Sequence, residues 1–235
     1  AFRTATGRGG ATQTRSDAAE VLAQADVRAV LGLMLDLWGY SMLEVGTFHA
    51  DPHPGNVLLQ EGGRIGLLDY GQMKTLPPEV QKKVAELIMA VANKDKSAMI
   101  DSVQSLGFEM EAEAEDDATP TPAVSCAMSS ETRQAPEVEF AESIFGGTVP
   151  TVKERLRVIR SIREAPSEMF FVIRVAVILR GVGFGLGHRV HLANSWKKYA
   201  KAHLDWCQRE AAQEAADAAD RAGSEAPSAA EEDKT

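Results

Sequence analysis

The sequence predicts a mainly α-helical protein that carries one small β-hairpin. Several long stretches place apolar residues three and four positions apart, which is the spacing of a helix that is buried on one side. The segments "NVLLQ" and "RIGLLD" flank Gly62 and Gly63, and short apolar runs around such a turn predict two paired strands. With 235 residues, of which 44% are hydrophobic, the chain is long enough to build a core.

Three helices are predicted in the first half of the chain. The first covers residues 18–45, because Asp17 and Glu20 have the spacing of a capping box before an Ala- and Leu-rich run. Pro77 and Pro78 begin the second helix, since proline is favoured in a first helical turn. Its predicted buried face consists of Val80, Val84, Leu87, Ile88 and Val91. The third helix is expected over residues 96–106.

The second half is predicted to contain a disordered insertion followed by more helices. The insertion is acidic and then rich in Pro and Ser, so it has too few apolar groups to offset the entropy of ordering. A basic helix over residues 152–163 and a buried helix over 166–187, ending in glycines, come next, and a last helix begins near Ala193. The expected parts are a leader (1–16), a first lobe segment (17–108), the insertion (109–135), C-terminal helices (136–210) and a helix end with a disordered acidic tail (211–235).

Composition excludes several classes of protein. The net charge of −9 argues against nucleic acid as a partner, because such binding depends on Lys and Arg that neutralise phosphates. The two cysteines, Cys126 and Cys207, form neither a disulfide framework nor a zinc motif, which favours a reducing compartment. Charged residues interrupt the apolar runs, so no transmembrane segment is expected. The leader has arginines and no acid before Asp17, a composition that fits either a disordered leader or the remnant of a transit peptide.

One Pro- and Gly-rich loop contains the residue types that phosphoryl transfer needs. Asp51 and Asn56 lie five positions apart, and Asp69 follows thirteen positions later, shortly before Gly71. Phosphoryl transfer requires a group that orients the attacking oxygen and oxygen ligands that hold Mg²⁺ against the phosphates. The spacing matches the protein-kinase patterns H-R-D-x-x-x-x-N and D-F-G. They are met here as His49-Ala50-Asp51 with Asn56 and as Asp69-Tyr70-Gly71, with Ala50 in place of the basic residue.

The motifs "HADPHPGN" and "LLDYG" resemble those of the UbiB or aarF-domain family of atypical kinases. The later segments "ILRGVGFGLG" and "NSWKKYAKAHL" resemble the C-terminal helices of that family in plants and algae. The resemblance covers residues 31–109 strongly and residues 152–204 weakly. It implies the large, C-terminal lobe of a protein kinase-like fold. It also implies a Mg²⁺- and ATP-dependent kinase or ATPase that supports prenylquinone and isoprenoid-lipid metabolism in a chloroplast or mitochondrion, as a soluble or membrane-peripheral protein.

The resemblance assigns a role to each polar residue of the loop. It implies that Asp51 is the catalytic-loop carboxylate and that His49 braces the loop. It further implies that Asn56 and Asp69 bind Mg²⁺ and, together with Gly71, the nucleotide, which is ATP or ADP.

The remaining residues of the motif are expected to contact phosphate or to shape the loop. His53 stands where a conventional kinase has a phosphate-contacting lysine, and an imidazole contacts phosphate well only when it is protonated. A loop histidine whose ring is satisfied by backbone groups is an equal alternative. Pro52 and Pro54 fix φ at two positions, while Gly55 permits φ of either sign.

The sequence also indicates what is missing around this loop. The residues before Phe48 contain neither a G-x-G-x-x-G strand pair nor a strand lysine, so the small lobe of a kinase is expected to be absent from this chain. A partner chain could then supply it. The segment between Gly71 and Pro78 is too short for a regulated activation loop, which disfavours a peptide substrate.

Two further alternatives follow from these gaps. The first is a non-catalytic, large-lobe protein that binds a partner or a lipid and retains the loop as a relic. The second concerns the basic helix over residues 152–163, which is either a solvated face or a contact for anionic lipid headgroups on a membrane surface. Nothing in the sequence predicts an oligomeric state.

Overall fold

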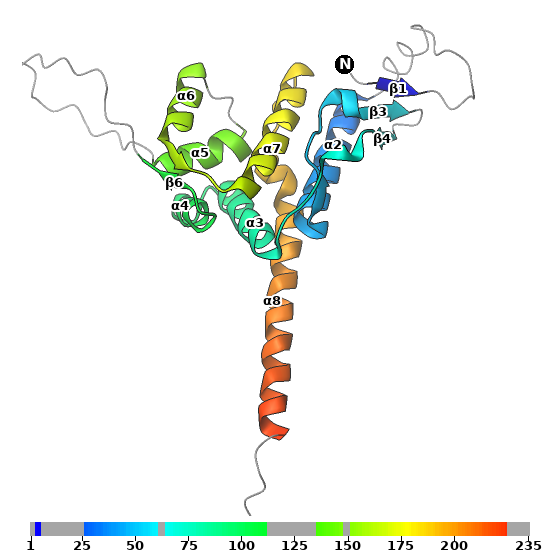
Figure 1. Cartoon of the computed structure of the whole chain (residues 1–235). Coiled ribbons are helices and arrows are strands. Elements are labelled where there is room, and N and C mark those ends of the chain that lie inside the picture. The colour runs from blue at the N-terminus through cyan, green and yellow to red at the C-terminus, as the bar shows by residue number, and fades with distance from the viewer. Residues whose placement is uncertain (1–2, 6–25, 61–63, 112–134, 148–150, 225–235) are drawn as a thin grey trace, which may run out of the picture.

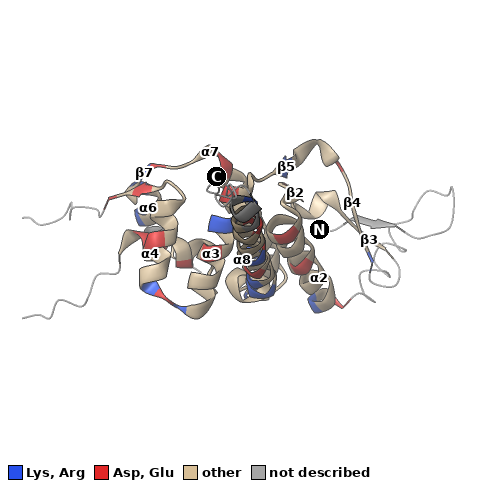
Figure 2. Ribbon diagram, turned by 90° about the horizontal axis from the view of Figure 1, so that it is seen from below, with Lys and Arg blue, Asp and Glu red and all other residues tan. Residues whose placement is uncertain are grey.

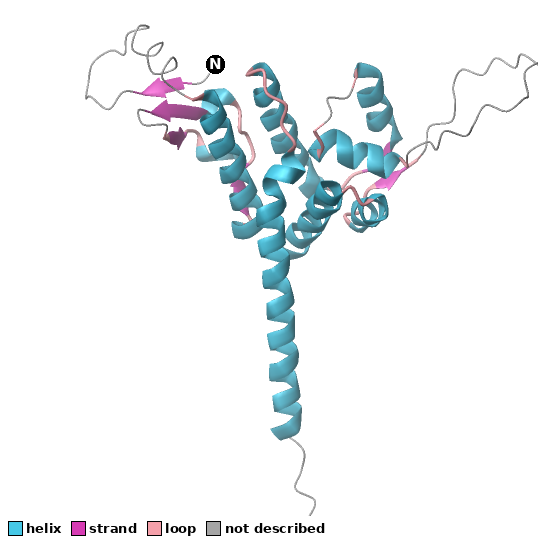
Figure 3. Ribbon diagram, turned by 180° about the vertical axis from the view of Figure 1, so that it is seen from behind, coloured by secondary structure: helices cyan, strands magenta, loops and turns pink. Residues whose placement is uncertain are grey.

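The computed structural model describes residues 3–5, 26–60, 64–111, 135–147 and 151–224, and these are mainly helical with small β-sheets (Figures 1 and 3). The predicted fold class, mainly α with a small hairpin, is therefore confirmed. The helices are α2 (Val27–Tyr40), α3 (Pro78–Asn93), α4 (Lys96–Ser105), α5 (Pro136–Phe145), α6 (Val152–Ser161), α7 (Ser167–Gly185) and α8 (Leu192–Ser224).

The predicted hairpin is present, and two further strand pairs accompany it. Strands β3 (Val57–Gln60) and β4 (Ile65–Leu67) run antiparallel, with Val57 opposite Leu67. Antiparallel pairs also join β2 (Thr47–His49) to β5 (Met73–Thr75), and β6 (Glu109–Met110) to β7 (Ile162–Glu164). The β2–β5 pair fixes both ends of the segment that contains the phosphoryl-transfer motif, because it lies immediately before the loop and immediately after the D-x-G turn.

The core lies where α8 packs against α2 and α3. Seen along α8, α2 lies on one side of it and α3 on the other (Figure 2). Trp38 and Trp196 are buried, and the indole N–H of Trp196 donates to the carbonyl of Leu35 at 2.9 Å. On the predicted apolar face of α3, Val80 is partly buried and the other members are fully buried, as the helical spacing indicated: Val84, Leu87, Ile88 and Val91.

The first predicted helix is shorter than expected. Asp26 has an extended backbone (φ −70°, ψ 101°), and its carboxylate accepts from the N–H groups of Arg28 and Ala29. Capping by Asp26 starts α2 at Val27, so a single continuous helix over residues 18–45 is wrong. The expected capping box at Asp17 lies outside the described residues. At its other end α2 passes into a π-helical turn, Ser41–Val45, which Gly46 ends at φ 78°.

Three other expectations are corrected by strand pairing. Glu109 and Met110 were predicted to lie in the disordered insertion, but they form β6; residues 112–134 of that segment lie outside the described residues. The basic helix ends at Ser161, because Ile162–Glu164 leave the helix to pair with β6, and Arg163 forms an ion pair with Glu111 at 2.5 Å. In the leader, Arg3–Ala5 form β1, which pairs in parallel with β3. Such pairing needs a partner strand distant in the sequence, which local patterns do not reveal.

Helices α7 and α8 are only partly buried. Helix α7 was predicted to be buried, but Phe170, Val177 and Phe184 are 60%, 53% and 70% exposed. Helix α8 begins one residue before the predicted position, and its distal half projects from the body (Figures 1 and 3). Every residue from Gln208 to Ala219 is exposed. Within the described residues, no helix combines the length and the hydrophobicity that a membrane span needs.

The contact between α2 and α8 predicts a sharp difference between two glycines of α2. A Cβ on Gly39 would lie 2.5 Å from Cδ1 of the buried Trp196, whereas a Cβ on Gly32 would meet nothing within 4 Å. Gly39→Ala is therefore expected to lower the free energy of unfolding by about 1–3 kcal/mol through overpacking. Gly32→Ala, the matched control, is expected to leave it unchanged or raise it by up to about 1 kcal/mol. Urea denaturation measures both, and equal effects would contradict the packing.

Candidate functional site

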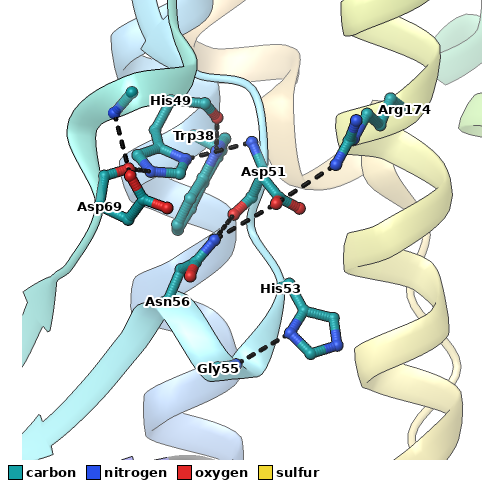
Figure 4. Close-up of polar contacts among 9 residues, drawn as sticks. Trp38, His49, Asp51, His53, Gly55, Asn56, Asp69 and Arg174 are labelled. Atoms are coloured by element: carbon teal, nitrogen blue, oxygen red, sulfur yellow. Dashed lines mark hydrogen bonds and ion pairs between the residues drawn. The ribbon is translucent and has the colours of Figure 1, made fainter.

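The predicted motif residues lie between the hairpin and α7. The loop from Ala50 to Asn56 connects β2 to β3, and the D-x-G turn follows β4 (Figure 4). The two segments are joined by the backbone, because the N–H of Ala50 donates to the carbonyl of Gln72 at 2.8 Å. Residues that are far apart in the sequence are thus held in one place by the β2–β5 pair and the β3–β4 hairpin.

His49 connects the loop to the turn through its ring. It is 3% exposed; its Nδ1 lies 3.1 Å from the backbone N of Asp51, and its Nε2 lies 2.9 Å from the carbonyl O of Asp69. Because Nδ1 accepts from a backbone N–H, the neutral ring carries its proton on Nε2 and donates it to Asp69. The carbonyl of His49 itself accepts from the indole N–H of Trp38 at 2.6 Å. These contacts fix the backbone at both aspartates.

Asn56 and Asp51 form the second set of contacts. The amide nitrogen of Asn56 lies 3.3 Å from both the carboxylate Oδ2 and the carbonyl O of Asp51. The 3-10 turn Pro54–Asn56 brings the side chain back toward Asp51, and the N–H of Asn56 donates to the carbonyl of His53. Since its amide N–H groups face Asp51, the side-chain oxygen of Asn56 is free to accept a different partner.

Asp69 adopts an unusual backbone conformation. Its φ of 58° and ψ of 75° lie in the left-handed region, which residues other than glycine rarely occupy. Its Oδ1 accepts from the N–H of Gly71 at 3.3 Å, while the residue as a whole is exposed. Such strained residues cluster at functional sites. The conformation leaves the second carboxylate oxygen available at the surface of the site.

The available oxygens fit the requirements of Mg²⁺ bound with a nucleotide. Among the described residues, no group of three or more His, Cys, Asp or Glu side chains is arranged to hold a metal ion. Mg²⁺ commonly needs only one or two carboxylates, because phosphate oxygens and water complete its shell. The carboxylate of Asp69 and the amide oxygen of Asn56 are a donor set of this kind.

Arg174 of α7 completes the site and was missed in the sequence. Its guanidinium lies 3.2 Å from Oδ2 of Asp51, and the two side chains are 38% and 22% exposed (Figure 4). In the sequence it only interrupts an apolar run. A charged residue in the middle of an apolar helix was the available signal, but nothing in the sequence indicates which carboxylate it meets more than 120 positions earlier.

His53 lies apart from the other motif residues. Its Nδ1 accepts from the N–H of Gly55 at 3.1 Å, and its ring points toward α7 and away from Asp69 (Figure 4). This arrangement, in which a backbone group satisfies the imidazole ring, is one of the two alternatives that the sequence offered for His53. The ring borders a cavity of about 480 Å³, otherwise lined by Pro54, Ile178, Gly181, Val182, Gly185 and Leu186.

The loop-shaping residues act partly as expected. Pro54 is the first residue of the 3-10 turn, and Pro52 is buried. Gly55 does not use a positive φ. A Cβ there would instead lie 3.1 Å from Nδ1 of His53, so a small residue permits the hydrogen bond between them. A small residue is needed at Gly71 for the same reason, because a Cβ there would lie 3.2 Å from Oδ1 of Asp69.

The site as a whole defines a class of protein. A carboxylate held by an asparagine, a second carboxylate in a strained turn and a histidine that joins them have the arrangement expected of a protein kinase-like catalytic loop and D-x-G turn. Residues 12–103 match the model of the ABC1 atypical kinase-like domain. This match to the ABC1 atypical kinase-like domain confirms the resemblance to the UbiB/aarF family found in the sequence.

Several relatives with curated descriptions come from Arabidopsis thaliana. The protein ACTIVITY OF BC1 COMPLEX KINASE 3, chloroplastic, is 39% identical over 67 residues, which are 28% of this chain and 9% of the relative. ACTIVITY OF BC1 COMPLEX KINASE 8, chloroplastic, is 28% identical over 183 residues, which are 68% of this chain and 24% of the relative. The aarF domain-containing protein kinase At1g71810, chloroplastic, is 28% identical over 147 residues, or 62% and 20% of the two chains. The chain thus spans less than a quarter of the length of each of these relatives.

A solved structure from Mycobacterium tuberculosis, the complex of Rv3197 with erythromycin, is also similar. It matches 78% of this chain and 45% of that chain, with a TM-score of 0.42 and 16% sequence identity.

Proposed function

We propose that this chain provides the catalytic loop and the metal motif of an ABC1-type atypical kinase or ATPase that uses Mg²⁺ and ATP. The observation that carries the proposal is the bridge made by His49 between the backbones of Asp51 and Asp69. It holds the two carboxylates in one site although they are separated by a hairpin. An isolated Pro- and Gly-rich turn would need no such buried connection.

Each residue then has a defined task. Asp51 accepts a hydrogen bond from the attacking hydroxyl or water and orients its oxygen toward the terminal phosphorus of ATP. Asn56 holds Asp51 through its amide N–H groups and presents its oxygen, with the Asp69 carboxylate, to Mg²⁺. When bound, Mg²⁺ neutralises the negative charge of the phosphates. Arg174 fixes the carboxylate of Asp51 from the other side.

The wider role follows the family. We propose that the protein acts in a plastid, because relatives that match it are named chloroplastic. The support of prenylquinone and isoprenoid-lipid metabolism is proposed from the resemblance to the UbiB/aarF family alone. The sequence segments proposed for the kinase-like lobe are residues 17–108 and 136–210. The nucleotide contacts of a small lobe are expected to come from a segment or chain other than the described residues.

Nucleotide binding tests the proposal directly. The protein is expected to bind ATP in the presence of Mg²⁺ and to lose most of that affinity when EDTA removes the metal, because the site offers oxygen ligands for the metal rather than basic groups for bare phosphate. Isothermal titration calorimetry with ATP, with and without Mg²⁺, measures the difference. Equal affinity in both conditions would contradict a metal-dependent nucleotide site. No binding in either would favour the non-catalytic, large-lobe alternative.

A further inference from the structure

His191 lies immediately before α8, and its ring caps this helix. Its Nδ1 lies 3.3 Å from the backbone N of Asn194 and accepts that N–H, as the side chain of an N-cap residue does. The carbonyl of His191 also accepts from the N–H of Ser195 at 3.1 Å, which begins the hydrogen bonding of the helix. An imidazole therefore stands where Ser, Thr, Asp or Asn is the usual cap.

The same ring packs against the end of another helix. A Cβ on Gly147, just after α5, would lie 2.8 Å from Cδ2 of His191, so the ring rests against that segment. The guanidinium of Arg180 of α7 donates to the carbonyls of Ser143 and Ile144 of α5, the second at 3.0 Å. The end of α5 is thus held by α7 and by the residue that caps α8. We call this meeting point the α8 junction.

The charges around the ring oppose a further positive charge in the α8 junction. Arg180 of α7 and Lys94, the C-cap of α3, are the cations that act on His191, and Glu142 of α5 is the anion. Burial is the main reason why the pKa of His191 is lowered; a backbone hydrogen bond and Glu142 raise it, and the two cations lower it. The N-terminus of α8 adds a partial positive charge. The neutral ring is therefore the form that suits the folded junction.

The turn that His191 caps makes central contacts of the core. Leu192 and Ala193 are fully buried, and so is Trp196. The indole N–H of Trp196 donates to the carbonyl of Leu35 of α2 at 2.9 Å, and its ring lies 6.4 Å from that of Phe145 of α5, between centroids. Loss of the cap would therefore weaken the contacts of α8 with both α2 and α5.

We propose that His191 is an acid-sensitive latch: as a neutral ring it caps α8 and closes the α8 junction, and protonation releases the first turn of α8. When Nδ1 gains a proton, it can no longer accept from the N–H of Asn194. The imidazolium also places a full positive charge at a helix N-terminus, where cations are unfavourable, in the same junction as Arg180 and Lys94. The latch lies outside the phosphoryl-transfer motif and does not depend on nucleotide.

The direction of the pH dependence follows from the lowered pKa. His191 has an ordinary pKa of 6.5, which applies in the unfolded chain, and a lower pKa in the folded chain. The unfolded chain therefore binds more protons between the two values, and the stability that the neutral ring contributes is complete above pH 6.5 and is lost as the pH falls. Burial also lowers the pKa of His203 of α8, which adds a dependence of the same sign. The contribution of His191 is thus the difference between wild type and a variant.

Two substitutions separate capping from titration. His191→Asn replaces the ring with an amide whose oxygen can cap the helix and which does not titrate. Between pH 7.5 and pH 5.5 its folding equilibrium constant is expected to fall less than that of the wild type, by a factor of at least about two, the smallest effect typical of a lost N-cap. His191→Ala removes the cap at every pH, so its folding constant at pH 7.5 should be about twofold to thirtyfold lower than that of the wild type.

Urea denaturation of the full chain at the two pH values measures these constants. Hydrogen exchange, corrected for the intrinsic effect of pH, locates the change: residues 192–196 should lose protection at pH 5.5 in the wild type and keep it in His191→Asn. An equal response to pH in the wild type and in His191→Asn would overturn the latch. If His191→Ala were as stable as the wild type at pH 7.5, the ring would not cap α8, and the proposal would also fail.

Discussion

Replacing Asp69 with Asn is expected to reduce Mg²⁺- and ATP-dependent turnover at least about a hundredfold. The substitution removes one negative charge and one metal ligand and changes little else. Asn is among the few residues that tolerate the left-handed backbone found here, at φ 58°. Its amide oxygen can still accept from the N–H of Gly71, as the carboxylate does now. ADP release at saturating Mg²⁺ and ATP measures the loss.

A matched substitution separates this effect from a general loss of negative charge. Asp101 is exposed on α4, away from the candidate site, so Asp101→Asn should retain full turnover. Thermal unfolding should give similar midpoints for both variants, since neither removes buried contacts. Turnover by Asp69→Asn equal to that of the control would refute the assignment of Asp69 as a metal ligand.

Replacing Arg174 with Gln is expected to lower kcat by about tenfold to a hundredfold while the affinity for Mg²⁺ and ATP stays nearly constant. Arg174 contacts Asp51 at 3.2 Å, and no contact joins it to Asn56 or Asp69. It is therefore a positioning residue for the carboxylate that orients the attacking oxygen, and small misplacements of such a group carry penalties of this size. The ion pair is partly exposed, so its contribution to stability should be only about 0–1 kcal/mol.

Arg174→Lys and Arg189→Gln complete the experiment. The lysine retains a positive charge near Asp51 and should restore part of kcat, although it lacks the planar fork of arginine. Arg189 is exposed just beyond the end of α7, and its replacement should leave both kcat and nucleotide affinity unchanged. If Arg174→Gln lowered affinity and left kcat intact, Arg174 would contact the nucleotide instead of positioning Asp51.

The residues of the candidate site were predicted from the sequence, but the contacts between them were not. Asp51, Asn56 and Asp69 were found because their spacing and residue types are specific to one kind of chemistry. The structure brings them together, and it shows how: the ring of His49 joins the two carboxylate segments. His53, from the same motif, turns toward α7, because its ring accepts from the backbone of Gly55. Spacing alone does not give the direction of a side chain.

The sequence by itself determined the elements whose cause is local. Helical spacing fixed the buried face of α3, and the glycines between two apolar runs fixed the β3–β4 hairpin. The phosphoryl-transfer motif was also readable, because its residues lie close together along the chain. Each of these signals is contained in a window of some 10–25 residues, within which propensity and periodicity act.

Only the tertiary structure decided what depends on residues that are distant in the sequence. The pairing of β6 with β7 ended α6 early, and the packing of α7 placed Arg174 on Asp51. Tertiary packing also left Leu156 and Ile159 of α6 uncovered while it buried Val158. The physical reason is the same in all three cases. Burial and strand pairing depend on which surfaces meet in the folded protein, whereas a sequence pattern indicates only the local preference of each residue and not the residue that it will contact.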